Sequence, residues 1–323
     1  MRSGLLSSSL RLVVIAGVAA GLALTVLAWL AHWWAALDVI NNGLPGVTAG
    51  AVVLLCLAAI ARDWRLIVPA ALIAAINIAL VIAASQGAAA DAAPGSQRFL
   101  RVATFNLWRG NERMGDVAGF LAEADADVVV LQEVTRDHGS KLRQALGPRY
   151  PYSLGETGLV ILSKHAIIAE GRVDRPGYPP WISLMLRWAR LEVNGTIFEL
   201  AGVHLARPFY PELQQQDIAV LTQFVRSRTL PLIVAGDFNM SPWSQKLERF
   251  TDATELKRYN TVHLSWPMRW RGMPLLPLVA IDNVFASRHF AAIATKGGPR
   301  LGSDHRPIIA DIVLAPPLPK ATK

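Results

Sequence analysis

The chain has 323 residues, of which 52% are apolar, and it carries a formal net charge of +8. This length allows one large domain or two smaller ones, and the apolar share exceeds that of a typical soluble enzyme. A basic chain suits partners that carry phosphate, such as nucleic acid, nucleotides or anionic lipid headgroups, although mild basicity can also serve only solubility. The single cysteine, Cys56, excludes an intrachain disulfide and a cysteine-based zinc site.

Apolar runs without a charged side chain follow one another at the start of the chain, at residues 12–31, 44–61 and 66–84. Each run has about 18–20 residues, the length that a helix needs to cross about 30 Å of hydrocarbon. A cleaved signal peptide is the alternative for the first run, and core helices of a soluble protein are the alternative for all of them. The succession favours three transmembrane helices, so residues 1–86 are predicted to anchor the chain in a lipid bilayer.

Arginines predict the orientation of this anchor. Arg2 and Arg11 precede the first run, Arg62 and Arg65 lie between the second and third runs, and residues 32–43 contain no lysine or arginine. Because basic residues concentrate in cytoplasmic loops, the N-terminus is predicted to be cytoplasmic and everything after the third run to lie outside. We therefore expect a multi-pass protein of the cytoplasmic (inner) membrane whose remaining part is periplasmic or extracellular.

The pattern changes beyond a small, flexible linker predicted at residues 87–98. Short apolar runs now alternate with amphipathic stretches, and Asn194-Gly195 is the strongest short signal for a β-hairpin. Hairpins mixed with helices predict mixed sheets covered by helices, in one α/β domain over residues 99–316 with a tail at 317–323. Strands are predicted within residues 99–108, 127–134, 158–164, 183–205, 230–239, 278–287 and 307–315, and a helix is predicted at 211–228.

Polar side chains gather at the ends of these apolar strands. A carboxylate in such a position is held by a rigid element and still reaches a cleft. Taken singly, they have structural alternatives: a turn for Asn106, a cap for Glu133, a core histidine for His204, an Asx-turn for Asp237, and an N-cap or a local salt bridge for Asp282. Their succession favours a shared site, whose members are Asn106, Glu133, His204, Asp237, Asn239, Asp282, Asp304 and His305.

A series of short segments resembles the successive motifs of the endonuclease/exonuclease/phosphatase (DNase I-like) superfamily. These segments are TFNLW, LQEV, GLVILSK, VHL, GDFN, IDNVFAS and GSDHRP. The resemblance covers about residues 99–315 and is nearest to membrane-anchored bacterial members. It implies a four-layer α/β sandwich with two central mixed sheets, and hydrolysis of phosphate esters with Mg²⁺ (or Mn²⁺). Asn283 departs from the family, which often has His or Tyr there, and this puts a substrate contact in question more than the chemistry.

The resemblance also implies a metal site. Mg²⁺ prefers hard oxygen ligands and usually keeps several waters, so one or two carboxylates suffice. Glu133 is implied as the principal ligand, with Asn106 and Asp304 nearby, either directly or through water.

The same resemblance assigns catalytic roles. Asp237 would position or deprotonate the attacking water, and Asn239 would hold both water and phosphate. His204 and His305 would donate to phosphate oxygens as negative charge accumulates on them. Asp282 is implied as the partner that orients His305 and favours its charged form.

The substrate stays open at this stage: nucleic acid, a nucleotide or a phospholipid headgroup. Residues 266–278 and 175–181 form two loops rich in aromatic residues, proline and arginine. An exposed loop of this composition can touch lipid or stack on bases, whereas a packed one merely covers the core. A catalytically idle, membrane-docked binding protein is the alternative to an enzyme, and a DNA-repair nuclease is the alternative if the orientation is reversed. No protein partner is inferred.

Overall fold

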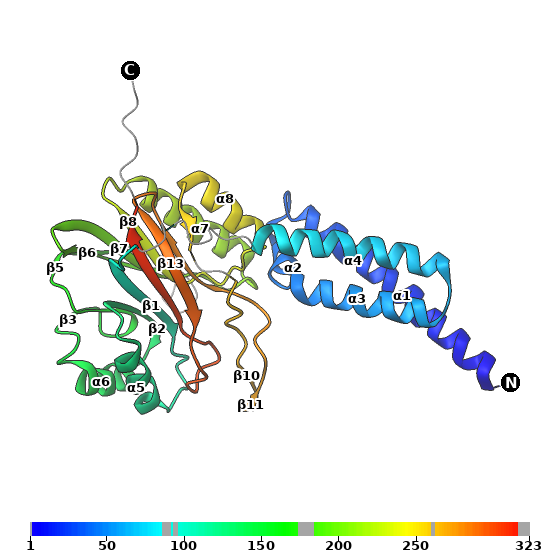
Figure 1. Cartoon of the computed structure of the whole chain (residues 1–323), viewed down its shortest axis with the longest axis horizontal. Helices are drawn as coiled ribbons and strands as arrows, with labels where there is room; N and C mark the ends of the chain where they lie inside the picture. Colours follow the sequence, from blue (N-terminus) through cyan, green and yellow to red (C-terminus); the bar gives the residue numbers. More distant parts are fainter. Residues whose placement is uncertain (1, 86–91, 93–95, 174–183, 260–261, 316–323) are drawn as a thin grey trace, which may run out of the picture.

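The computed structural model describes residues 2–85, 92, 96–173, 184–259 and 262–315. It consists of a helical bundle joined to one end of an α/β sandwich (Figure 1). The predicted loop at 175–181, the predicted tail at 317–323 and most of the predicted linker at 87–98 lie outside the described residues.

The bundle contains the predicted apolar runs. Its long helices α1 (Arg2–Leu30), α3 (Leu44–Ile60) and α4 (Trp64–Ser85) lie side by side, and the short η1 (Ala35–Leu37) and α2 (Asp38–Asn42) connect α1 to α3 (Figure 1). The segments Ser9–Leu30 and Trp64–Ser85 are long and apolar enough to cross a membrane. The α3 helix has only 17 residues and becomes a third candidate if it forms one span with Ala35–Asn42, from which it is bent by 62°.

A polar side chain inside the bundle forms hydrogen bonds within it. Asn77 of α4 is fully buried, and its side-chain amide donates to Thr25 Oγ1 of α1 at 2.9 Å and to the Ile73 carbonyl at 2.9 Å. Such pairing is what makes a polar side chain tolerable in an apolar surrounding.

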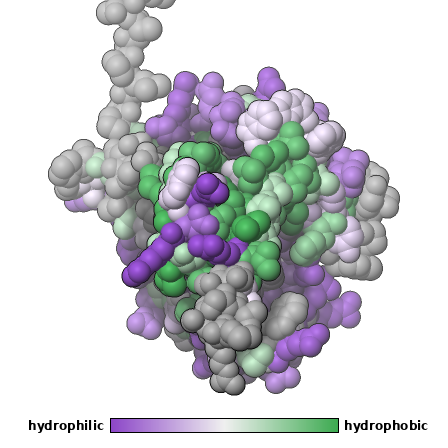
Figure 2. Space-filling view, turned by 90° about the vertical axis from the view of Figure 1, so that its right-hand side faces the viewer, coloured by the Kyte–Doolittle hydropathy of each residue, from purple (hydrophilic) through white to green (hydrophobic). Residues whose placement is uncertain are grey.

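The two ends of the bundle differ. The N-terminus and the loop between α3 and α4 lie at the end away from the sandwich, whereas the ends of α1 and α4 lie beside it (Figure 1). Viewed from the far end, the bundle presents a largely apolar surface with hydrophilic residues gathered at its tip (Figure 2). At the sandwich end Trp29, Trp33 and Trp34 are exposed, as expected of an aromatic belt at a membrane interface.

The sandwich contains two six-stranded sheets, and each is mixed because it contains one parallel pair, β1–β2 or β7–β8. The first sheet has the order β13-β14-β1-β2-β4-β3, formed by β13 (Phe290–Gly297), β14 (Ile308–Leu314), β1 (Leu100–Asn106), β2 (Val128–Val134), β4 (Gly158–Ser163) and β3 (Tyr152–Leu154). The second has the order β5-β6-β7-β8-β12-β9, formed by β5 (Ile167–Val173), β6 (Met185–Val193), β7 (Thr196–His204), β8 (Leu232–Asp237), β12 (Asp282–Ala286) and β9 (Lys257–Arg258).

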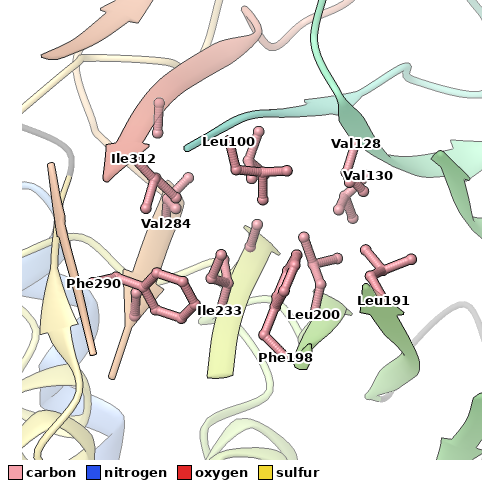
Figure 3. Close-up of a cluster of buried hydrophobic side chains, with 14 of the residues drawn as sticks. Leu100, Val128, Val130, Leu191, Phe198, Leu200, Ile233, Val284, Phe290 and Ile312 are labelled. Atoms are coloured by element: carbon pink, nitrogen blue, oxygen red, sulfur yellow. The ribbon is translucent and has the colours of Figure 1, made fainter. Parts of the chain in front are cut away.

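Four layers result from the way these elements bury their apolar faces. Helices α5 (Met114–Ala124) and α6 (Arg136–Leu146) cover the first sheet, and α7 (Pro211–Arg226) and α8 (Gln245–Thr254) cover the second. The inner faces of the two sheets meet in a core that includes Leu100, Val130, Phe198, Ile233 and Phe290 (Figure 3). The predicted fold class, a four-layer sandwich with two central mixed sheets, is therefore confirmed.

A buried polar junction joins the bundle to the sandwich. Asp38 Oδ2 accepts from Ser244 Oγ at 2.6 Å and Asp38 Oδ1 accepts from the Gln245 amide at 2.9 Å, which puts a carboxylate at the N-terminus of α8. Asn42 Oδ1 accepts from the Ser241 amide at 2.7 Å. Because Asp38 and Asn42 are almost completely buried, these bonds satisfy groups that have left water. We call residues 38–42 and 241–246 the junction.

Candidate active site

Strand register brings the predicted residues of the second sheet together. Asp237, at the end of β8, is paired with His204 at the end of β7 and with Asp282 at the start of β12. The preceding Gly236 has no substitute here, because a Cβ at this position would lie 2.0 Å from the Val203 carbonyl oxygen. The close approach of β7 and β8 at this point explains the glycine of the GDFN motif.

The Asp237 carboxylate is the centre of the site. Its Oδ2 accepts from Asn106 Nδ2 at 3.0 Å and from Asn239 Nδ2 at 3.4 Å. The Nε2 atoms of His204 and His305 lie 3.6 Å and 3.8 Å from the same oxygen. One buried carboxylate oxygen therefore faces side chains from strands of both sheets and from the loop before β14.

The other oxygen of Asp237 has a structural role. Oδ1 accepts from the Asn239 amide at 2.8 Å, which closes the Asx-turn that was the structural alternative for this residue. Asn239 has a φ of 51°, and its Nδ2 also donates to the Leu205 carbonyl at 2.9 Å. Asp237 thus shapes the turn with one oxygen while the other faces the site.

His305 forms a buried pair with Asp282. Nδ1 of the ring lies 2.8 Å from Asp282 Oδ2, an arrangement that leaves Nε2 facing Asp237. Burial alone would lower the pKa of His305, but the negative charges of Asp282 and Asp237 outweigh burial and raise this pKa to about 10. The predicted contact between Asp282 and His305 is present, and it fixes the direction of the ring.

Glu133 lies at the other side of Asn106, in a strained backbone conformation with a φ of 56°. Its carboxylate accepts from the Arg109 amide at 3.2 Å and lies 3.5 Å from Asn106 Nδ2. Burial raises the pKa of this carboxyl, but the charge of His204 and the Arg109 amide act against it, and the net effect is a lowered pKa. Glu133 is therefore an ionised carboxylate held in a nearly buried position.

Asn106 and Asp304 are placed differently from Glu133. The Asn106 amide nitrogen faces the carboxylates of Glu133 and Asp237, while its oxygen accepts from the Trp108 amide at 3.0 Å. Asn106 was predicted to lie near the metal either directly or through water, and this arrangement favours contact through water. Asp304 is half-buried and accepts from Trp266 Nε1 at 3.2 Å, a partner that the sequence did not indicate.

The chemistry of these donors fits a hard divalent cation. One ligand atom each from Asp237, Asp282 and His305 all lie within 4.8 Å of one another. The hydrogen bond between His305 Nδ1 and Asp282 occupies two of these groups, whereas the ionised carboxylate of Glu133 lies outside this pair. Carboxylate oxygens are ligands for a hard divalent cation rather than a soft metal.

Several residues of the site were not predicted. Ser303 Oγ donates to the Asn106 carbonyl at 2.7 Å and accepts from the His305 amide at 3.0 Å, which ties β1 to the GSDHRP loop. Arg207 reaches to 3.7 Å from Glu133, and the guanidinium of Arg269 lies 4.5 Å from the centre of the Trp108 ring. Ser303 lies inside a recognised motif and could have been found there. Arg269 lies in the arginine-bearing loop 266–278 that the sequence indicated, whereas nothing in the local sequence marks Arg207.

Comparisons with known proteins agree with this geometry. The model of the Endonuclease/Exonuclease/phosphatase family matches residues 103–305, more than half of the chain. Among curated proteins, no match was found.

Solved structures similar to this chain share its fold. The endonuclease/exonuclease/phosphatase from Bacteroides vulgatus superposes with a TM-score of 0.56 at 21% identity, over 67% of this chain and 99% of that one. The mannosyl-6-phosphatase from Bacteroides thetaiotaomicron superposes with a TM-score of 0.55 at 18% identity, over 67% of this chain and 100% of that one. Sphingomyelinase C from Streptomyces griseocarneus superposes with a TM-score of 0.51 at 19% identity, over 65% of this chain and 98% of that one. The chain therefore belongs to the endonuclease/exonuclease/phosphatase family and is a hydrolase of phosphate esters.

Proposed function

We propose that the protein is a membrane-anchored, divalent-metal-dependent phosphoesterase whose catalytic domain faces away from the cytoplasm. The observation that carries this proposal is the convergence on Asp237 Oδ2 of the side chains of Asn106, Asn239, His204 and His305. Such an array of donors around one buried carboxylate suits the handling of a water molecule beside a charged phosphate.

Each residue has a distinct task in this proposal. Burial raises the pKa of Asp237, with the charge of His305 acting in the opposite direction, so this carboxylate is a better proton acceptor than an exposed one. Asn239 holds the water and a phosphate oxygen. His204 and His305 donate to the phosphate oxygens on which charge grows, and Asp282 keeps His305 oriented for this.

A divalent ion held by Glu133, with Asn106 and Asp304 nearby, would neutralise phosphate charge when bound. We expect EDTA to abolish activity and Mg²⁺ or Mn²⁺ to restore it. Glu133→Gln should mainly raise the metal concentration required for half-maximal activity, because the amide keeps the shape but loses the ionised ligand. Metal titrations of hydrolysis of bis-(p-nitrophenyl) phosphate by the two full-length proteins measure this.

The matched control is Asp116→Asn, which removes an exposed carboxylate on α5 that pairs with Arg113 outside the site. It should leave the metal requirement unchanged. Full activity of the EDTA-treated protein would disprove metal dependence, and an unchanged requirement in Glu133→Gln would remove its role as a ligand.

Membrane anchorage is proposed from the bundle. Its apolar helices place the arginine-bearing loop and the N-terminus at the end opposite the sandwich (Figure 1). If the arginine-rich end is cytoplasmic, the sandwich lies on the other side of the membrane.

Reporter fusions test this orientation. We expect alkaline phosphatase fused after Ala90 to be active, and a fluorescent protein that matures only in the cytoplasm to stay dark at the same position. The same reporters fused after Asp63, in the loop between α3 and α4, should give the opposite pattern. A reversed result at both positions would overturn the outward orientation and favour the DNA-repair alternative.

The substrate is approached through a panel. Similar structures include a mannosyl-6-phosphatase, a sphingomyelinase and a TDP2 bound to a single-stranded DNA product. The full-length protein in detergent should be assayed with phosphomonoesters, nucleotides, DNA, RNA and phospholipids. Absence of hydrolysis across this panel, with bound metal verified, would support the idle binding protein instead.

A further inference from the structure

The rim of the proposed active site contains exposed apolar side chains on two loops. The first loop, residues 207–210, follows β7, and the second, residues 266–278, contains the small β10 (Arg269–Trp270) and β11 (Met273–Pro274) hairpin. Among the described large apolar residues, Leu276 and Phe209 are the most exposed, at 77% and 75%, and exceed every such residue of the membrane-type helices. We call residues 207–210 and 266–278 the rim.

Both loops are tied directly to site residues. Arg207, two positions before Phe209, lies 3.7 Å from Glu133. In the second loop, Trp266 donates to Asp304 and Arg269 Nη1 donates to the Gly302 carbonyl at 3.0 Å. The root of this loop is packed, since Met268 is buried, whereas Met273, Leu276 and Leu278 project into solvent. The sequence left open whether residues 266–278 form an exposed loop or pack over the core. Their outer part is exposed, and their root is packed.

The rim lies at the end of the sandwich that is joined to the helical bundle. Figure 1 shows the β10–β11 hairpin on the same side of the sandwich as the bundle. The turn that holds Asn239 continues to Ser241, whose amide donates to Asn42 beside α3. The α7 helix, which begins directly after Tyr210, packs against η1, close to the exposed Trp33 and Trp34. The site therefore opens near the level at which an aromatic belt marks a membrane interface.

The rim also contains positively charged side chains. Arg207 has a side chain that is 62% exposed, and Arg269 and Arg271 lie at the hairpin. Apolar side chains interleaved with arginines are suited to the boundary between acyl chains and phosphate headgroups. A water-soluble substrate would need no such apolar surface around the catalytic groups.

We propose that the substrate is a phosphate ester of a lipid, presented to the site by the bilayer that holds the helices, with Phe209, Met273, Leu276 and Leu278 inserted among its headgroups. This inference rests on the proposed phosphoesterase function and names its substrate class. The rim holds the lipid surface, the arginines meet its phosphates, and the groups around Asp237 hydrolyse the ester.

The test uses the full-length protein reconstituted in vesicles of phosphatidylcholine, phosphatidylglycerol, phosphatidylethanolamine or sphingomyelin, with metal supplied. Release of phosphate or of a phosphorylated headgroup is measured beside hydrolysis of water-soluble bis-(p-nitrophenyl) phosphate. We expect at least one lipid to be hydrolysed. In the double variant Phe209→Ser, Leu276→Ser, kcat/KM on that lipid should fall about tenfold or more, with bis-(p-nitrophenyl) phosphate turnover unchanged.

Ile197→Ser is the matched control. Ile197 is also exposed, but it lies near the start of β7, roughly 23 Å along the strand from His204. It should hydrolyse lipid at the wild-type rate.

The outcomes separate the two proposals. Hydrolysis of bis-(p-nitrophenyl) phosphate, nucleotides or nucleic acid without hydrolysis of any vesicle lipid would overturn the lipid substrate and leave the phosphoesterase intact. Equal lipid hydrolysis by the double variant and the wild type would overturn the role of the rim. Absence of hydrolysis of every substrate would overturn the proposed function itself.

Discussion

The variant His305→Ala is expected to lose most of kcat, by about 10²–10³-fold, with a smaller effect on KM, because in the proposed mechanism the His305 ring donates to charge that develops in the transition state. Asp282→Asn should lose somewhat less, since the imidazole remains but is poorly oriented once Oδ2 no longer carries charge. Because the proposed mechanism makes the two side chains one unit, the double variant should be hardly slower than His305→Ala alone. Steady-state kinetics on a verified substrate measure all three.

Stability distinguishes this role from a structural one. Removing the ring leaves the buried carboxylates of Asp282 and Asp237 without their cation, so the melting temperature should fall while the protein stays folded at assay temperature. A histidine with a raised pKa contributes stability that is fully present below its ordinary pKa of 6.5 and is lost as pH rises through about 10. The difference in melting temperature between the wild type and His305→Ala should therefore narrow as pH rises from 6.5 to about 10. A folded His305→Ala protein with near wild-type turnover would end the catalytic assignment.

The second large effect is expected at Asp237. Asp237→Asn keeps the shape of the side chain and an oxygen for the Asn239 amide, but it removes the proposed proton acceptor. Loss of a positioned general base costs about 10²–10⁴-fold in rate. We expect kcat to fall by this amount with metal affinity largely kept.

Folding offers a check on this variant. The new amide nitrogen replaces Oδ2 and faces the donors Asn106 Nδ2 and Asn239 Nδ2, so the melting temperature should fall while the protein stays folded at assay temperature. Asp311→Asn is a useful comparison, because Asp311 pairs with Arg101 on the first sheet, away from the site. It should lower stability and leave kcat unchanged. A turnover of Asp237→Asn close to that of the wild type would show that another group handles the water.

Much of the fold could be predicted because buried strands produce continuous apolar runs. The β2 strand is buried throughout, and the sequence around it predicted a strand at 127–134. Asn194-Gly195 predicted the β6–β7 turn, in which both residues have the positive φ that such a hairpin requires. The β5 strand was not predicted, because its half-buried and exposed positions alternate without a clear apolar run.

The site was predictable as a set of residues but not as a geometry. Motif resemblance identified Asp237 and His305, yet only the register of β8 with β7 and β12 places His204 and Asp282 beside Asp237. The partner of Asp304 could not be predicted, since Trp266 is far from it in the sequence and its indole hydrogen bond depends on how the second rim loop packs. Arg207 reaches Glu133 only because β7 and β2 end at the same edge of the sandwich.

The junction has a consequence for how the enzyme meets its substrate. Asp38 and Asn42 are buried against residues 241–245, and Arg258 also donates to the Ala84 carbonyl at the end of α4. A domain joined to its anchor by one long disordered tether sweeps a hemisphere and samples the surrounding solution. The catalytic domain of this protein is instead hydrogen-bonded to its helical bundle at several points. In a protein anchored as proposed, these bonds fix the height and tilt of the catalytic groups above the membrane. For the proposed lipid substrate, encounters then depend on lateral diffusion in the plane, and the surface density of the ester, rather than its bulk concentration, governs the rate.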